Sequence, residues 1–500
     1  MTEILTSAQM RAIEQAAIDS GQVTGLDLME RAGAAVVARI LAQWPEAKPR
    51  AVVLCGPGNN GGDGYVIARL FRARGWQIHL WAPLAAATPD AAANAVRWTE
   101  TEAVLTDLPT EALDGAIVID ALFGTGLGRP VGGAFLGALT MARAKAARLV
   151  AVDILSGVCA DTGQIRADDA YLARGADLTV TFQAPKHGHM LLPGAQLCGS
   201  LDIADIGLAS ALADLSRSER ARDLAISAPV PAADRLLKND GHKFSHGHVL
   251  VLAGGVGRGG AARLAARAAL RVGAGLVTVA CPPAALIENA ARLDAVMLRA
   301  LPDATALPPL LESLRISALC LGPGLGLGER EAALVRAALD SKLPLVLDAD
   351  ALTLIARDET LRTLLHRDCV LTPHEGEFRR LWPELAADPA LSKCARTVRA
   401  SDATGAVVLL KGADTVIAEP DGSPMIHSAL REDAAPQLAT AGSGDVLAGL
   451  IAGLVARSIP PSEAASASVW LHAEAARQFG PGLISEDLPD AVPVVLRDLR

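Results

Sequence analysis

The 500-residue sequence is poor in aromatic residues, and Phe, Tyr and Trp together make up 3% of it. Stacking platforms for unpaired nucleic-acid bases are built from such rings, so the composition supplies little material for them. Basic residues are also a minority, because 46 Lys and Arg stand against 55 Asp and Glu and leave a net charge of −9. An acidic chain without a basic run lacks the electrostatic footprint of a protein that binds nucleic acid or an anionic membrane.

Paired cysteines and long apolar runs are missing as well. The seven cysteines are odd in number and scattered, and none forms a C-x-x-C pair, which disfavours a disulfide framework or a thiolate zinc site and fits a reducing cytoplasm. No stretch of about 18–20 uninterrupted apolar residues is available to span a bilayer. The first residues, MTEILTSAQMRAIEQ, lack the apolar core of a signal peptide. We therefore expect a cytoplasmic protein without nucleic-acid or membrane partners.

Short buried strands alternate with helices along the chain, and this pattern is typical of parallel sheets covered on both faces. One hydrophobic core rarely grows past roughly 250–300 residues, so we expect two such domains. We place them at residues 1–210 and 228–500, joined by a linker at 211–227 within a polar, Ala/Ser-rich stretch. The predicted strands are 51–55, 77–81, 116–120, 148–154 and 177–182 in the first domain, and 248–253, 276–280, 318–321, 345–347, 370–372 and 407–410 in the second.

A polar glycine loop, GPGNNGGDG, follows the first buried strand and precedes a helix. It matches the G-x-G-x-x-G pattern of dinucleotide-binding folds, but the next strand ends without the acidic residue that holds a ribose in NAD-dependent dehydrogenases. A standard dehydrogenase is therefore disfavoured. We favour an anion-binding loop over a simple tight turn, because its glycines let backbone N–H groups approach a phosphate beside a helix N-terminus.

Polar side chains also stand at the ends of the later strands of this domain. Because the carboxyl ends of parallel strands face one crevice, Asn60, Asp120 and Ser156 could supply oxygen ligands to one hard cation. Lys186 follows another strand and could form an acid/base pair with Asp153 in the same crevice. Each aspartate alone could instead cap the turn that follows it.

The segments GNNGGDG, IDALFGTGLGRP, AVDILSG and TFQAPKHG resemble the N-terminal domain of the NAD(P)H-hydrate repair enzymes over roughly residues 1–210. The resemblance implies a Rossmann-like, three-layer α/β/α domain that interconverts the R and S forms of hydrated NAD(P)H (NAD(P)HX). It implies potassium on Asn60, Asp120 and Ser156. It implies substrate contacts from Asp153 and from two loops, namely Asn59, Asn60, Gly61, Gly62 and Asp63, and Gly124, Thr125, Gly126, Leu127, Gly128, Arg129 and Pro130.

In the second half, polar or glycine-rich segments follow four strands, at 322–326, 348–350, 372–377 and 411–415. A further segment, GSGD, begins a long helix. Glycines before a helix expose N–H groups to an anion, and Asp445 at the helix start can act as a base toward a hydroxyl. Each segment alone could be a turn or a cap, but four at successive strand ends favour a binding site.

The motifs LTPHEGEF and GSGDVLAG, with HGHVLVLAGG, resemble the ribokinase-like dehydratase domain of the same enzymes over roughly residues 228–495. The implied reaction dehydrates S-NAD(P)HX to NAD(P)H while ADP becomes AMP and phosphate, with Mg²⁺ present and Asp445 as the catalytic base. The implied NAD(P)HX contacts are Ala261, Gly324, Gly326, His374 and Asp445. The implied ADP contacts are Lys411, Gly412, Ala413, Asp414, Thr415 and Gly444.

Two other functions stay open from the sequence. A small-molecule kinase of the ribokinase superfamily would carry a similar GSGD segment, with the N-terminal domain as a regulatory module. The N-terminal domain could also be a binding module without activity, although the presence of both Asp153 and Lys186 argues against this. We expect NADHX or NADPHX and ADP as small-molecule partners, and a homo-oligomer. The sequence does not distinguish NADHX from NADPHX, or ADP from ATP.

Overall fold

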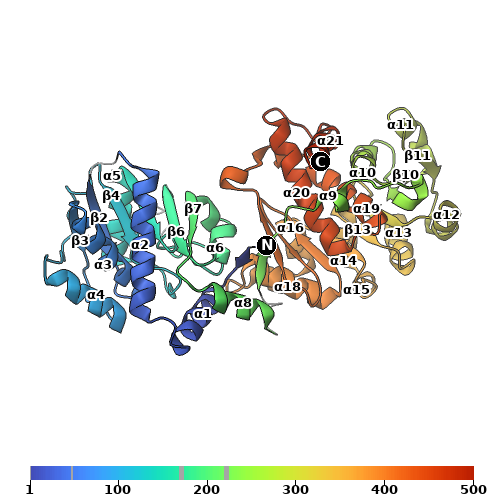
Figure 1. Ribbon diagram of the computed structural model, residues 1–500. Helices are drawn as coiled ribbons and strands as arrows, with labels where there is room; N and C mark the ends of the chain where they lie inside the picture. Colours follow the sequence, from blue (N-terminus) through green and yellow to red (C-terminus); the bar gives the residue numbers. More distant parts are fainter. Residues whose placement is uncertain (1, 47–48, 168–173, 219–223, 500) are drawn as a thin grey trace. The chain divides into compact units, whose positions relative to one another are not determined.

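A computed structural model of the chain describes residues 2–46, 49–167, 174–218 and 224–499. The chain forms two compact units, Thr2–Ala225 and Ile226–Arg500 (Figure 1). Within the described ranges, no helix combines the length and the apolar character needed to cross a membrane. Of the linker expected at 211–227, residues 211–217 belong to helix α8 (Ala209–Arg217), which packs on helix α1 (Ser7–Asp19), and 219–223 lie outside the described residues.

The first unit is a parallel sheet between helical layers, with strand order β3-β2-β4-β5-β6-β7. This confirms the expected three-layer α/β/α architecture. The strands of this sheet are β2 (Arg50–Cys55), β3 (Gln77–Trp81), β4 (Ile117–Ala121), β5 (Arg148–Val152), β6 (Leu178–Phe182) and β7 (Ser200–Ala204), and the short strand β1 (Glu3–Ile4) lies outside it. The remaining helices are α2 (Gly25–Gln43), α3 (Asn59–Ala73), α4 (Pro89–Thr99), α5 (Gly133–Lys145), α6 (His187–Met190) and α7 (Gly194–Leu197).

Alternate residues of these strands serve opposite faces of the sheet, because successive side chains of a strand point to opposite sides. Val53 and Ile119 belong to an apolar cluster shared with α2 and α3. Val52 and Val118 belong to a second cluster shared with α5. Both faces are therefore covered, which explains why the strands are continuous apolar runs in the sequence.

The second unit is a larger mixed sheet, with strand order β8-β17-β16-β15-β14-β13-β12-β9-β10-β11. β16 is antiparallel to both of its neighbours, and the other pairs are parallel. The strands are β8 (Ala225–Ser227), β9 (His248–Leu252), β10 (Leu276–Cys281), β11 (Met297–Ala300), β12 (Ala318–Leu321), β13 (Leu345–Leu347), β14 (Cys369–Leu371), β15 (Val407–Leu410), β16 (Asp414–Ala418) and β17 (Met425–Ser428).

Helices cover both faces of this sheet as well. One face packs on α10, α19, α20 and α21, and the other on α12, α13, α14 and α16. The helices are α9 (Ala233–Leu236), α10 (Gly259–Arg271), α11 (Leu286–Ala290), α12 (Leu307–Leu314), α13 (Glu329–Asp340), α14 (Ala349–Arg357), α15 (Glu359–Arg362), α16 (Glu375–Leu381), α17 (Pro383–Ala387), α18 (Lys393–Thr404), α19 (Ser443–Ala456), α20 (Pro461–Phe479) and α21 (Leu488–Asp498). The α/β character expected for this half is confirmed.

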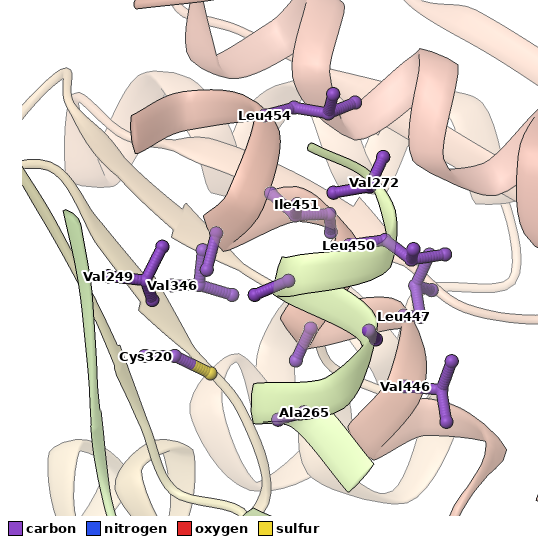
Figure 2. Close-up of a cluster of buried hydrophobic side chains, with 14 of the residues drawn as sticks. Val249, Ala265, Val272, Cys320, Val346, Val446, Leu447, Leu450, Ile451 and Leu454 are labelled. Carbon is purple, nitrogen blue, oxygen red and sulfur yellow. The ribbon is translucent and has the colours of Figure 1, made fainter. Parts of the chain in front are cut away.

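Helices α10 and α19 approach each other closely above the sheet. Figure 2 shows Leu450 and Ile451 of α19 in the apolar cluster formed with Val249 and Val346 of the sheet. Glycine makes the approach possible, because a Cβ atom at Gly449 would lie 2.1 Å from the backbone oxygen of Ala265 in α10. The contact holds the middle of α19, the helix that begins at the GSGD segment, against α10.

We predict that Gly449→Ala destabilises the second unit by about 1–3 kcal/mol, because the added methyl group overpacks the contact between the two helices. Gly260→Ala in α10 is the matched control, since the nearest atom to a Cβ there is 3.9 Å away, at the end of a flexible arginine. Urea unfolding of the two variants measures the difference. Equal stability of both variants would contradict the close helix contact.

Candidate active sites of the two units

The sheet of the first unit reverses its strand order at β2, because β3 lies on one side of β2 and β4 on the other. In open α/β sheets, ligands bind beyond the carboxyl ends of the strands at such a point. A cavity of about 380 Å³ lies there, between α1 and the loops that follow β2 and β4. The expected site residues that line it are Asn59, Asn60, Asp63, Gly124, Thr125, Gly126, Asp153 and Lys186.

The other expected substrate residues of this unit lie away from the cavity wall. A Cβ at Gly61 would lie 1.8 Å from the backbone oxygen of Gly56, and one at Gly62 would lie 2.5 Å from the sulfur of Met29. These two glycines therefore let the start of α3 pack against its neighbours. The loop after β4 also contains four expected residues that do not line the cavity, namely Leu127, Gly128, Arg129 and Pro130.

Asp153 and Lys186 form a buried ion pair, with 2.9 Å between Oδ1 and Nζ. Lys186 Nζ also donates to Thr181 Oγ1 at 2.8 Å and to the carbonyl oxygen of Phe182 at 3.0 Å, so its three N–H groups are all engaged. The second oxygen of Asp153 accepts the N–H of Thr125 at 3.1 Å. Burial opposes the charged form, but Lys186 and the hydrogen bonds hold the pKa of Asp153 below its usual value. Asp153 is therefore a carboxylate at neutral pH.

The backbone around this pair is held by a histidine to which the sequence analysis gave no role. His189 Nδ1 accepts the backbone N–H of Lys186 at 2.9 Å, and Nε2 lies 2.9 Å from the carbonyl oxygen of Asp153. Asp153 itself has a left-handed φ of 65°, a conformation that costs about 1–3 kcal/mol in a non-glycine residue and clusters at functional sites. The strain and the histidine together fix the carboxylate at the cavity wall.

The three residues expected to hold a cation meet beside the same loop. Asp120 is fully buried and accepts the backbone N–H of Ser156 at 2.9 Å and its hydroxyl at 2.6 Å. Burial raises the pKa of Asp120. Within the described part of the chain, the buried amide oxygen and nitrogen of Asn60 have no hydrogen-bond partner, and a Cβ at Gly124 would lie 3.2 Å from that oxygen. An unpaired amide oxygen and a buried carboxyl group at the same loop suit a cation that prefers oxygen ligands.

Helix α1 forms a wall of the cavity that the sequence analysis missed. Arg11 and Glu14, one turn apart on α1, both line the cavity. Burial and, to a smaller extent, Asp153 raise the pKa of Glu14 to about 7, against the opposing effects of Lys186 and Arg11. Burial also raises the pKa of Asp63 on α3 well above its usual value, with contributions from Asp153 and Glu14. In the sequence, these two cavity residues are marked only by being charged and three positions apart on one predicted helix, a common pattern on exposed helix faces.

The second unit has a corresponding point at β9, where β10 lies on one side and β12 on the other. The loop after β12 meets the start of α10 there. A Cβ at Gly324 would lie 2.7 Å from the carbonyl oxygen of Arg258 and 3.5 Å from the Cβ of Ala261, and one at Gly326 would lie 3.5 Å from the guanidinium of Arg258. The structure therefore brings Ala261, Gly324 and Gly326 together, and adds Arg258 as an exposed cation that the sequence analysis missed.

Asp445, in the first turn of α19, lies within a group of charged side chains. Lys411 Nζ is 2.7 Å from Asp348 Oδ1 and 4.0 Å from Glu377 Oε2, and a Cβ at Gly444 would lie 3.3 Å from the same ammonium. Burial and, to a smaller extent, Asp348 raise the pKa of Asp445 to about 6, against the opposing effect of Lys411. Asp445 can therefore gain and lose a proton close to neutral pH, as a general base requires.

Both units match known protein families. A family model described as NAD(P)H-hydrate dehydratase matches residues 249–486, and one described as YjeF-related protein N-terminus matches residues 25–188. A bifunctional NAD(P)H-hydrate repair enzyme from Moorella thermoacetica is 37% identical over 99% of this chain and 97% of its own, and one from Coxiella burnetii is 34% identical over 98% of both. The chain belongs to the bifunctional NAD(P)H-hydrate repair enzymes.

Solved structures also resemble part of this chain. A ribokinase-like protein of Enterococcus faecalis shares 25% identity with this repair enzyme at a TM-score of 0.47, covering 54% of this chain and 95% of its own. An ADP/ATP-dependent NAD(P)H-hydrate dehydratase of Bacillus subtilis shares 25% identity at a TM-score of 0.45, covering 54% and 96%. The family resemblance stated from the motifs is confirmed by the full-length relatives.

The remaining expected contacts of this repair enzyme lie in the segment after β15 and just before α16. Asp414 is buried and paired with Lys393 at 2.7 Å, and the hydroxyl of Thr415 donates to the carbonyl oxygen of Gly412 at 2.7 Å, so these side chains shape the turn. Gly412 and Ala413 are exposed. His374 caps α16, accepting the N–H of the second helical residue at 2.9 Å, while 56% of its side chain stays exposed.

Proposed function

We propose that the chain repairs hydrated nicotinamide cofactors. The domain at residues 1–210 interconverts R- and S-NAD(P)HX, and the domain at 228–500 dehydrates S-NAD(P)HX to NAD(P)H while ADP becomes AMP and phosphate, with 211–227 as the connection. The observation that carries the proposal is that each unit has its own carboxyl group beside a lysine that follows a strand, Asp153 with Lys186 in one and Asp445 with Lys411 in the other. Membership of the repair-enzyme family over nearly the whole chain supports both activities.

In the dehydratase, Asp445 takes the proton of the hydroxyl on the reduced nicotinamide ring. The hydroxyl oxygen attacks the terminal phosphorus of ADP, and AMP leaves with the electrons of the broken P–O bond. The N–H groups at the start of α19 face the transferring phosphoryl group, where they stabilise its charge. The ring nitrogen then expels phosphate, which is a better leaving group than hydroxide, and loss of a proton from the neighbouring carbon gives NAD(P)H.

A nucleotide is the co-substrate of this step, and we propose that Mg²⁺ accompanies it. Within the described residues, no group of three or more His, Cys, Asp or Glu side chains is arranged to hold a metal. Mg²⁺ in nucleotide sites is commonly held by one or two carboxylates together with the phosphates, and Asp348 and Glu377 are the carboxylates closest to Lys411. When bound, the ion neutralises phosphate charge.

In the epimerase, Asp153 serves as the carboxylate base and Lys186 holds it in place. We propose that Asn60, Asp120 and Ser156 hold a potassium ion beside the cavity, because their oxygens are uncharged apart from one carboxylate, a donor set that suits a monovalent ion. The ion would offset repulsion between Asp120 and the substrate phosphates. The seven cysteines are buried and form no disulfide, which suits a cytoplasmic enzyme.

We predict that Asp120→Asn weakens hydrate binding and removes the potassium dependence of epimerisation, because it takes away the charge that holds the ion. Dehydration of S-NADHX should be unchanged. The measurement is R-to-S conversion in potassium and in a large organic-cation buffer, with Asp107→Asn, an exposed residue of the same unit, as the control. Equal epimerisation by the wild type in both buffers would count against a bound potassium ion.

A product assay tests the proposed dehydratase. With S-NADHX and ADP, we expect AMP and inorganic phosphate to appear in step with NADH absorbance. A small-molecule kinase would instead accumulate a stable phosphorylated compound without a gain in NADH, and that result would overturn the proposal.

A further inference from the structure

Epimerisation of the hydrate, the activity proposed above for the first unit, requires two proton transfers. The hydroxyl group leaves the ring carbon as water and so must receive a proton, while the ring nitrogen supplies the electron pair that forms a C=N bond. Water then adds to the other face of the same carbon and must lose a proton. The site therefore needs one group that holds a proton and one group that can accept one.

The ion pair at the strand ends supplies only the acceptor. All three N–H groups of Lys186 are engaged, with Asp153, Thr181 and Phe182, and its side chain is 1% exposed. Lys186 therefore has no proton directed at the cavity. Asp153 stays ionised because Lys186 and its hydrogen bonds outweigh the effect of burial and lower its pKa. The proton donor must come from elsewhere in the cavity.

The other charged or titratable groups that line the cavity are few. They are Arg11 and Glu14 on α1, Asp63 on α3 and Asp90 at the start of α4. On α8, which packs against α1, Asp214 lines a different cavity. The lining residues contributed by α2 carry no titratable side chain. A guanidinium group is not a proton donor in general acid catalysis, so the choice lies among the carboxyl groups.

Glu14 has the properties that the donor needs. Its side chain is partly exposed to the cavity, and no hydrogen bond or ion pair ties its carboxyl group to another described residue. Burial, reinforced by Asp153, raises its pKa to about 7, so both protonation states are populated at neutral pH. Asp63 is more deeply buried, which raises its pKa well above the usual value and leaves its carboxyl group less accessible to a ligand in the cavity than that of Glu14.

We propose that Glu14 is a catalytic residue of the epimerase and protonates the departing hydroxyl group, while Asp153 accepts the proton of the incoming water. The C–O bond breaks as the ring nitrogen forms C=N, and the Glu14 proton completes the departing water. The new C–O bond forms on the other face, the C=N electrons return to nitrogen, and Asp153 accepts the proton of the added water. Before the next turnover Asp153 loses this proton and Glu14 regains one, both by exchange with solvent. In the reverse direction the two carboxyl groups exchange roles, and nothing is oxidised or reduced.

The experiment measures the pH profile of R-to-S conversion by the full-length chain. The wild-type rate should fall above pH 7, as Glu14 loses its proton. Glu14→Gln should lower the rate by about 10²–10⁴-fold and remove this alkaline limb. Glu14→Asp keeps an acid at the position and should retain the limb at a reduced rate. Asp19→Asn, at the exposed end of the same helix, is the matched control and should behave as the wild type.

Each outcome separates this inference from the proposed function. A wild-type chain that does not interconvert the epimers overturns the proposed function itself. A Glu14→Gln variant with the wild-type rate, or with a residual rate that keeps the alkaline limb, overturns only the role of Glu14. If Asp63→Asn lost the fall in rate above pH 7 and Glu14→Gln kept it, the proton donor would be Asp63 instead of Glu14. Dehydration of S-NADHX, measured on every variant, should stay unchanged, and if Glu14→Gln does not fold, the absence of the limb in Glu14→Asp overturns the inference.

Discussion

Asp445→Asn is expected to slow dehydration of S-NADHX by about 10²–10⁴-fold, the usual effect of removing a general base. The substitution keeps the shape of the side chain and removes its ability to accept the hydroxyl proton. ADP binding should change little, because the expected nucleotide contacts come from residues 411–415 and the backbone at the start of α19. Steady-state turnover and ADP binding by calorimetry measure the two effects separately.

The pH dependence of the wild type provides a second check on Asp445. Burial and Asp348 raise the pKa of this carboxyl group to about 6, so the base is ionised above pH 6 and becomes protonated below it. Dehydration should therefore decline as the pH falls through about 6, and Asp445→Asn should lack this decline. Asp340→Asn, at the exposed end of α13, is the control. Near wild-type turnover by a folded Asp445→Asn variant would remove Asp445 from the mechanism.

Lys186→Met is expected to destabilise the first unit by about 3–5 kcal/mol and to abolish epimerisation. The reason is that Asp153 would be left as a buried carboxylate without its cation. Lys145→Met is the matched control, since Lys145 forms a surface ion pair with Asp114 at a distance of 3.5 Å. Such a surface ion pair contributes about 0–1 kcal/mol to stability. Urea unfolding measures both variants.

A double variant separates charge burial from packing at this pair. Asp153→Asn combined with Lys186→Met removes both charges, so it should recover part of the stability that Lys186→Met loses, while epimerisation stays absent. A Lys186→Met chain as stable as the Lys145→Met control would contradict the buried ion pair. Recovery of epimerisation in the double variant would contradict the role of Asp153.

The sequence predicted the central strands of both sheets because they are buried on both faces. β2 and β4 in the first unit and β9 and β12 in the second are continuous apolar runs between glycine or polar segments. β7 (SLDIA) was missed because it is a half-exposed edge strand and has no such run. The antiparallel strands β16 and β17 were missed because β16 begins inside the KGADT turn, which the sequence analysis treated only as a ligand loop.

The candidate sites were predictable where they follow a strand. Parallel strands bring their carboxyl ends to one edge, so Asp153 and Lys186 could be expected in one crevice, and the structure pairs them. Glu14 could not be found this way, because it reaches the cavity from a helix that precedes the sheet in the chain. Lys411 was expected at the nucleotide, and the structure pairs its ammonium with Asp348, a contact that depends on how two strand ends face each other.

The most direct test of the account follows a mixture of R- and S-NADHX incubated with the full-length chain, with and without ADP. We expect both epimers to become NADH when ADP is present, with one AMP formed per NADH. Without ADP, no NADH should form, but an unequal mixture should relax to its equilibrium ratio faster than without the protein. With ADP, persistence of the R form at its uncatalysed rate would contradict an epimerase in the first unit, and NADH formation without nucleotide would contradict the phosphoryl-transfer mechanism in the second.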